Sequence, residues 1–132
     1  MTGSGFLGTL LAVYLSGWII PEGAAGIPLL LAASAVSVWL TGIAETSLGN
    51  KDDPRIVLDE IIGYFWTIAC LPSRGWGVSL AAFVLFRVFD TFKIPSRSVQ
   101  NLSGGWGVMM DDILSGIAAN LILHAALKFL FP

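Results

Sequence analysis

Apolar residues fall in five stretches, separated by polar segments of unequal length. The stretches cover about residues 6–20, 27–44, 61–72, 78–89 and 113–131. None of them shows the strict alternation of polar and apolar positions that is typical of strands. Only helices and closed barrels can cross a bilayer, because backbone polar groups must be satisfied internally there. The pattern therefore predicts an all-α fold, an integral membrane bundle of about four to five apolar helices.

The lengths of the stretches separate two kinds of helix. With a rise of about 1.5 Å per residue, residues 27–44 and 113–131 can cross roughly 30 Å of hydrocarbon, and residues 6–20 are marginal. Residues 61–72 and 78–89 are about 12 residues each, which is short for a span. We expect these two to form a short or re-entrant hairpin that reaches part of the way across the bilayer.

Composition supports a membrane location. The chain has 132 residues, room for a single domain over 1–132; 55% of residues are hydrophobic, 12% are charged and the mean hydropathy is +0.80. A soluble domain carries about 25% charged residues. The net charge of −2 is too small to argue for or against any partner, but the lack of a basic patch argues against nucleic acid.

The polar connections suggest how the chain is oriented. Residues 21–26 and 73–77 are short turns, whereas 45–60 and 90–112 are long and hold most of the charge. If the apolar stretches alternate in direction, both long connections lie at one end of the bundle. Their excess of basic residues predicts that this end faces the cytoplasm. The C-terminus would then lie outside.

Seven charged residues lie in three short clusters inside this apolar sequence. Carboxylates beside hydrocarbon are costly and usually have a function. Mg²⁺ binds carboxylate oxygens and substrate phosphate together, and Arg and Lys bind phosphate oxygens. Five acids with one Arg and one Lys therefore indicate a metal and a phosphate. The clusters are Asp59 and Glu60; Arg87, Asp90 and Lys93; and Asp111 and Asp112.

Each cluster taken alone also has a purely structural interpretation. Asp59 and Glu60 could complement the dipole at a helix N-terminus. Arg87 and Asp90 are three residues apart and could form an internal ion pair. The pair at 111–112 follows a glycine-rich segment and could cap the start of the last helix.

Other polar residues have ordinary explanations. We expect Asp52 and Asp53, in a polar connection, to be solvated, and Glu45 to support the site or to be a loop charge. His124 is expected to pack or hydrogen-bond within the bundle. Cys70 is the only cysteine, which excludes an intrachain disulfide.

A different class of function also fits the composition. A small membrane transporter or ion-binding protein could use intramembrane acids to line a pathway. That function predicts acids spread through the depth of the membrane. The clusters here are expected at one end, which favours an enzyme that acts at the membrane surface.

The three clusters lie in sequence motifs that resemble the phosphatidylglycerophosphatase A family of bacterial membrane enzymes. The motifs are IVLDEIIG (56–63), FRVFDTFK (86–93) and GGWGVMMDDILSG (104–116), in the order found in the family. GFLGTL (5–10) and AETSLGNKDD (44–53) are weaker matches. One departure is Lys93-Ile94-Pro95-Ser96, where the family usually has Lys-Pro-x-Pro.

The resemblance implies an activity and a location. It implies Mg²⁺-dependent hydrolysis of phosphatidylglycerophosphate to phosphatidylglycerol and phosphate. The enzyme would lie in the bacterial cytoplasmic (inner) membrane with its active site on the cytoplasmic side. The implied partners are the phospholipid substrate and membrane lipid. Whether the protein forms a homo-oligomer is left open.

The resemblance also implies roles for the clustered residues. Asp59, Glu60, Asp111 and Asp112 would bind Mg²⁺. Asp90 would be a further ligand or a general base, and all five acids are catalytic candidates. Arg87 and Lys93 would hold the substrate phosphate. Whether the nucleophile is water or an Asp is left open.

Overall fold

The computed structural model describes residues 3–51, 53–95 and 98–130, and these residues form an all-α bundle without strands. Two short 3₁₀ helices lie in the connections. The elements are α1 (Gly3–Ile19), η1 (Gly23–Ala25), α2 (Gly26–Leu48), α3 (Leu58–Ile68), α4 (Trp76–Phe92), η2 (Ser98–Asn101) and α5 (Gly105–Leu130). The expected helical class is therefore confirmed.

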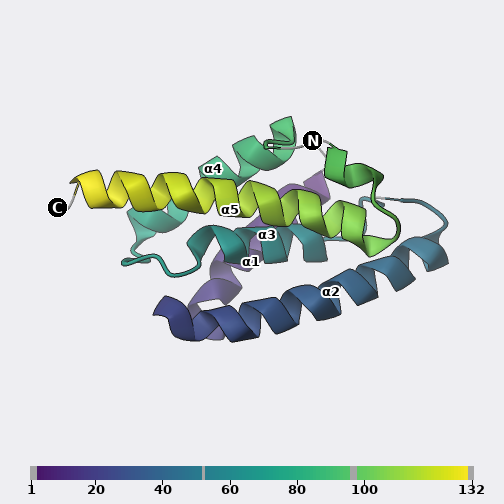
Figure 1. The fold of residues 1–132 in the computed structure, drawn as a ribbon, viewed down its shortest axis with the longest axis horizontal. Coiled ribbons are helices and arrows are strands. Elements are labelled where there is room, and N and C mark those ends of the chain that lie inside the picture. Colours follow the sequence, from purple (N-terminus) through teal and green to yellow (C-terminus); the bar gives the residue numbers. More distant parts are fainter. Residues whose placement is uncertain (1–2, 52, 96–97, 131–132) are drawn as a thin grey trace.

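Successive helices run in alternating directions, so the two long connections lie at the same end of the bundle (Figure 1). The Lys51 Nζ, in the α2–α3 connection, donates hydrogen bonds to the carbonyl oxygens of Gln100 and, at 2.8 Å, Leu102. Both acceptors lie in the α4–α5 connection. The charged segments, far apart in sequence, are thus joined directly.

Helix α3 is the centre of the bundle and packs against each of the other four α-helices. It has only 11 residues, about 16 Å in length, so it does not cross a bilayer alone. Helix α4 is longer than the sequence indicated, with 17 residues. The expected short hairpin therefore consists of one short central helix and one of nearly full length.

The C-terminus of α3 lies inside the bundle, where its carbonyl groups need protein partners. The Asn120 Nδ2 of α5 donates to the carbonyl oxygens of Thr67 and Ala69, both at 2.8 Å. The His124 Nε2 lies 3.1 Å from the Cys70 carbonyl oxygen. The expected hydrogen-bonding role of His124 is confirmed.

Helix α5 begins at Gly105, well before the apolar stretch at 113, and Asp111 and Asp112 therefore lie in its second turn. The capping interpretation of this pair is wrong. The reason is close packing: a Cβ at Gly105 would collide with backbone atoms of Val38 and Gly42 in α2. Contact between the two backbones outweighs the low helix propensity of glycine.

Two helical segments, Gly23–Leu48 and Gly105–Leu130, are long and apolar enough to cross a membrane, with mean hydropathies of 1.9 and 1.7. Only 28% of the apolar stretch of each segment is buried in the bundle. A core helix of a soluble protein would be mostly buried instead. Helix α1 is a shorter apolar helix. These features are consistent with a membrane protein.

Candidate active site

The seven clustered residues come from three helices that meet at the end of the bundle with the long connections. Asp59 and Glu60 lie in the first turn of α3. Arg87 and Asp90 lie in the last two turns of α4, and Lys93 caps that helix in a left-handed conformation (φ 56°). Because α3 begins and α4 ends at the same end of the bundle, these two clusters face the acids of α5.

Glycines allow α3 and α5 to approach closely beside the acids. A Cβ at Gly63 would lie 2.8 Å from the carbonyl oxygen of Asp112 and 2.5 Å from the ring of Phe86. A Cβ at Gly116 would collide with the carbonyl oxygen of Gly63. The acids of α3 and α5 are therefore brought together by backbone contact one or two turns away.

The carboxylates form two groups that share one residue. Oxygens of Asp59, Glu60 and Asp112 lie within 4.8 Å of one another, and so do oxygens of Asp90, Asp111 and Asp112. Four of the five acids are buried, with exposed fractions between 2% and 8%, whereas Glu60 is half-buried. Each group has the size and the oxygen donors of a divalent-cation site.

The two basic residues of the clusters contact the second group. The Arg87 Nη1 lies 2.7 Å from the Asp90 Oδ2, so the internal ion pair that the sequence left open is present. The Lys93 Nζ lies 3.0 Å from Asp90, 2.7 Å from Asp111 and 3.9 Å from Asp112. Burial alone would lower the pKa of Lys93, but Asp112, Asp111 and Asp90 together raise it above its ordinary value. Lys93 is therefore charged.

The first group differs from the second at two of its carboxylate oxygens. Glu60 Oε2 and Asp112 Oδ2 are buried atoms that have no hydrogen-bond partner among the described residues. A buried carboxylate oxygen without a partner is costly. Among the seven clustered residues, five are acids and two are basic, which is a formal excess of three negative charges. Hard oxygen ligands with this charge fit Mg²⁺.

Two residues of the site were missed by the sequence analysis. The Gln100 Nε2, from η2, donates to the Asp111 Oδ2 at 2.9 Å. Gly5 of α1 packs on the site so closely that a Cβ there would lie 2.5 Å from Glu60 Oε1 and 3.3 Å from Arg87 Nη1. Gly5 is the first residue of the weaker motif GFLGTL, which was the only sequence feature that pointed to it. No sequence feature pointed to Gln100, because it lies in an irregular polar connection.

Asp53 is buried rather than solvated, with 5% of its surface exposed. Its side chain accepts hydrogen bonds from the Arg55 Nε at 2.8 Å and Nη2 at 2.9 Å. These bonds hold the pKa of Asp53 well below its ordinary value. The expectation was wrong because a nearby cation folds back over the carboxylate. Asp52 lies outside the described residues.

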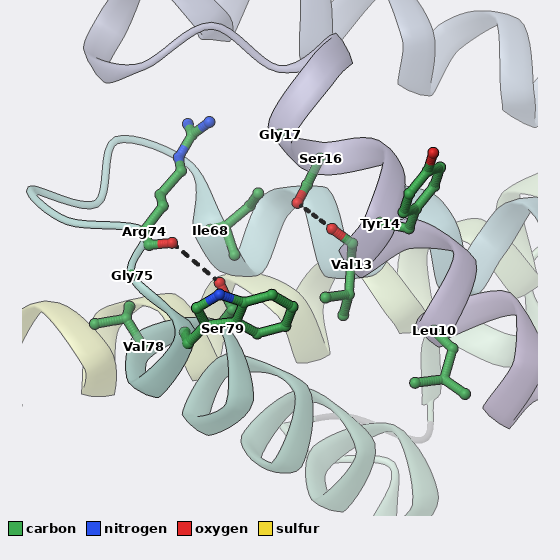
Figure 2. A pocket seen from close by; sticks show the side chains of 11 residues that line it. Leu10, Val13, Tyr14, Ser16, Gly17, Ile68, Arg74, Gly75, Val78 and Ser79 are labelled. Atoms are coloured by element: carbon green, nitrogen blue, oxygen red, sulfur yellow. Dashed lines mark hydrogen bonds between the residues drawn. The ribbon is translucent and has the colours of Figure 1, made fainter.

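A separate pocket of about 400 Å³ lies at the opposite end of the bundle (Figure 2). Apolar side chains from α1, α3 and α4 line most of it, including Leu10, Val13 and Ile68. The guanidinium group of Arg74 points away from this lining and donates to the carbonyl oxygens of Ile20 and Pro21. The lining includes none of the clustered acids, so this pocket is not the acidic site.

Comparison with known proteins agrees with the motifs. The family model described as Phosphatidylglycerophosphatase A matches residues 1–127. The chain belongs to the phosphatidylglycerophosphatase A family. No solved structure matches the chain.

Relatives of this phosphatidylglycerophosphatase A family member carry two descriptions. The phosphatidylglycerophosphatase A of Haemophilus influenzae is 42% identical over 80 residues, covering 59% of this chain and 49% of the relative. That of Escherichia coli is 37% identical over 91 residues, covering 67% and 53%. A Bacteroides thetaiotaomicron protein, provisionally described as a phosphatidylinositol-3-phosphatase, is 36% identical over 92 residues, covering 67% and 57%. The chain spans about half the length of these curated relatives.

Proposed function

We propose that this protein is a Mg²⁺-dependent lipid phosphatase that hydrolyses phosphatidylglycerophosphate to phosphatidylglycerol and phosphate. The observation that carries the proposal is the pair of acid groups that share Asp112, with Arg87 and Lys93 beside them at one end of an apolar bundle. Membership of the phosphatidylglycerophosphatase A family and the names of two relatives support the same substrate.

The first acid group would hold the metal ion. Asp59, Glu60 and Asp112 can each direct one carboxylate oxygen at a common position. Buried oxygens of Glu60 and Asp112 have no hydrogen-bond partner in the part of the chain that the structure describes. Asp111, in the second group, would act on the ion indirectly, by holding the Lys93 ammonium group at 2.7 Å beside Asp112. When bound, Mg²⁺ would offset the charge of the phosphate oxygens and increase the acidity of a water molecule.

The remaining residues act on the phosphate through charge. Arg87 and Lys93 provide positive charge against the negative charge that spreads over the phosphoryl oxygens in the transition state. Asp90 holds both side chains by ion pairs at 2.7 and 3.0 Å, so their positions are set before substrate binds. Preorganised charge of this kind needs no rearrangement during the reaction.

The reaction replaces one phosphorus–oxygen bond by another. A nucleophile forms a new bond to phosphorus, the bond to the glycerol oxygen breaks, and that oxygen receives a proton. If water attacks, one of the acids accepts its proton as general base. If an Asp attacks, a phospho-enzyme forms, and water hydrolyses it in a second step.

The apolar helices place this chemistry at a membrane surface. The acyl chains of the substrate would lie against the exposed apolar faces of the bundle, and the headgroup would reach the charged end. We assign that end to the cytoplasmic side of the bacterial cytoplasmic membrane, because basic residues are in excess there. The same gathering of acids at one end disfavours a transport pathway through the bilayer.

A second substrate is favoured by one observation. The Bacteroides thetaiotaomicron relative is described as a phosphatidylinositol-3-phosphatase. Both lipids carry a phosphomonoester on a headgroup, so the same charges could serve either. Rates on the two lipids, measured side by side, separate the two assignments.

The deciding experiment measures phosphate release from phosphatidylglycerophosphate in mixed micelles, with Mg²⁺ or with EDTA. We expect Mg²⁺-dependent release, and a loss of about 100-fold or more in Asp59→Asn. Glu22→Gln removes an exposed acid of the α1–α2 turn and is expected to retain full activity. Release that is unaffected by EDTA, or no release by a folded wild type, would contradict the proposal.

A further inference from the structure

The second acid group already contains a cation, the ammonium group of Lys93. Its Nζ lies 2.7 Å from Asp111 Oδ2 and 3.0 Å from Asp90 Oδ1. The third member, Asp112, is 3.9 Å away through Oδ1. The oxygens that could hold a metal ion in this group therefore surround a positively charged nitrogen instead.

The backbone holds Lys93 in this place. Lys93 is the C-cap residue that follows α4. Its N–H donates to the Asp90 carbonyl oxygen at 3.3 Å, and the Ile94 N–H donates to the Phe89 carbonyl oxygen at 2.9 Å. The Ser115 Oγ of α5 donates to the Ile94 carbonyl oxygen at 3.0 Å. The segment that carries Lys93 is thus hydrogen-bonded both to α4 and to α5, the helix of Asp111 and Asp112.

The two acid groups differ in the way their charge is offset. The second group has Lys93, the ion pair from Arg87 and the hydrogen bond from Gln100. Asp112 is 2% exposed, and its Oδ2 has no hydrogen-bond partner among the described residues, although its Oδ1 is the oxygen nearest Lys93. The Asp112 carboxylate thus has one oxygen that faces Lys93 and a second oxygen that can bind another cation.

We propose that Lys93 is a built-in cation that takes the place of a second metal ion. The native site then binds a single divalent ion, at Asp59, Glu60 and Asp112. The group of Asp90, Asp111 and Asp112 accepts a second ion only when Lys93 is replaced by a neutral residue. This inference rests on the proposed function for the identity of the first ion.

The physical reason is electrostatic. Three buried carboxylates within 4.8 Å of one another repel strongly unless positive charge lies among them. An ammonium group is a compact point charge and supplies it without an exchangeable ion. Removing it restores an oxygen-lined site with the net charge that attracts a divalent cation.

The test counts bound Mn²⁺ in the 132-residue protein in detergent, by titration followed through the EPR signal of the unbound ion. We expect one Mn²⁺ per chain in the wild type and two in Lys93→Met. Lys128→Met, which removes an exposed lysine of the last turn of α5, is the matched control and should bind one. Two ions that share Asp112 should also give an exchange-coupled spectrum, which the wild type should lack.

Three results would overturn the inference. The first is one ion in Lys93→Met, and the second is two ions in the wild type. The third is a Lys93→Met protein that stays unfolded at millimolar Mn²⁺, because the added ion should replace the lost charge. For the same reason Mn²⁺ should raise the Tm of Lys93→Met more than that of the wild type. Phosphate release is measured in a separate assay. If Lys93→Met binds one ion and the wild type is active, only the role of Lys93 is refuted. If the ion counts are as expected but the wild type is inactive, only the proposed phosphatase activity is refuted.

Discussion

At the scale of single residues, Asp112 connects the two acid groups. It is almost fully buried, and its oxygens belong to both groups. In Asp112→Asn the amide keeps the shape of the side chain but loses the negative charge. We expect phosphate release to fall by about 100-fold or more and Mn²⁺ binding to be lost. Full activity with unchanged Mn²⁺ binding would show that Asp112 is not a ligand.

Gly5 provides a test of how closely α1 covers the site. In Gly5→Ala the added Cβ would lie 2.5 Å from Glu60 Oε1, so the carboxylate must move. We expect about a 10-fold loss of phosphate release, similar to the loss of a supporting group around a metal ligand. The measurement is the initial rate at saturating lipid, with the folded state verified by the Tm.

Gly17→Ala is the matched control for this change, because a Cβ at Gly17 meets nothing within 4 Å. It should retain wild-type activity and gain slightly in stability, since alanine favours the helix. Equal activities of Gly5→Ala and Gly17→Ala would mean that Glu60 adjusts without consequence and that α1 does not shape the site.

At the scale of elements, η2 supports the site through Gln100. Its amide donates to Asp111, and the Lys51 ammonium group holds the carbonyl oxygens of Gln100 and Leu102. In Gln100→Leu the side chain keeps its bulk but loses the donor. We expect Mn²⁺ affinity to fall by about 10-fold, as measured by titration. Unchanged affinity would limit Gln100 to a role in folding the connection.

The buried end of α3 depends on Asn120 of α5. Asn120→Ala would leave the carbonyl oxygens of Thr67 and Ala69 without their side-chain donor. We expect a loss of about 1–3 kcal/mol in the free energy of unfolding and a lower Tm, with one Mn²⁺ still bound. Asn101→Ala, an exposed amide of η2, is the control and should leave the Tm nearly unchanged. An unchanged Tm in Asn120→Ala would mean that water reaches this helix end.

At the scale of the whole molecule, the alternating helices place the two kinds of connection at opposite ends (Figure 1). Single cysteines test whether these ends lie on opposite sides of a membrane. In a Cys70→Ser background, Asn50→Cys marks the charged end and Glu22→Cys the other; both positions are exposed. A membrane-impermeant maleimide added to intact cells should label Glu22→Cys but not Asn50→Cys. Labelling of Asn50→Cys alone would reverse the proposed orientation.

The helical class and the order of the apolar segments could be predicted from the sequence, because hydrophobic length and the absence of alternation are local properties. Helix ends were less predictable. Helix α5 begins at Gly105 and not near residue 113, since packing on α2 outweighs the helix propensity of its glycines. Whether Arg87 forms an ion pair with Asp90 was likewise open until the positions of the two side chains were known.

The seven charged residues stand out in the sequence itself, because charge inside apolar segments is costly wherever the chain folds. Their grouping depends on tertiary structure. That Asp112 belongs to two acid groups, that Lys93 lies inside one of them, and that Gly5 and Gln100 border the site all follow from contacts between residues distant in the chain. Such contacts are decided by how closely the backbones of α1, α3, α4 and α5 can pack, and no local pattern of residue types encodes that distance.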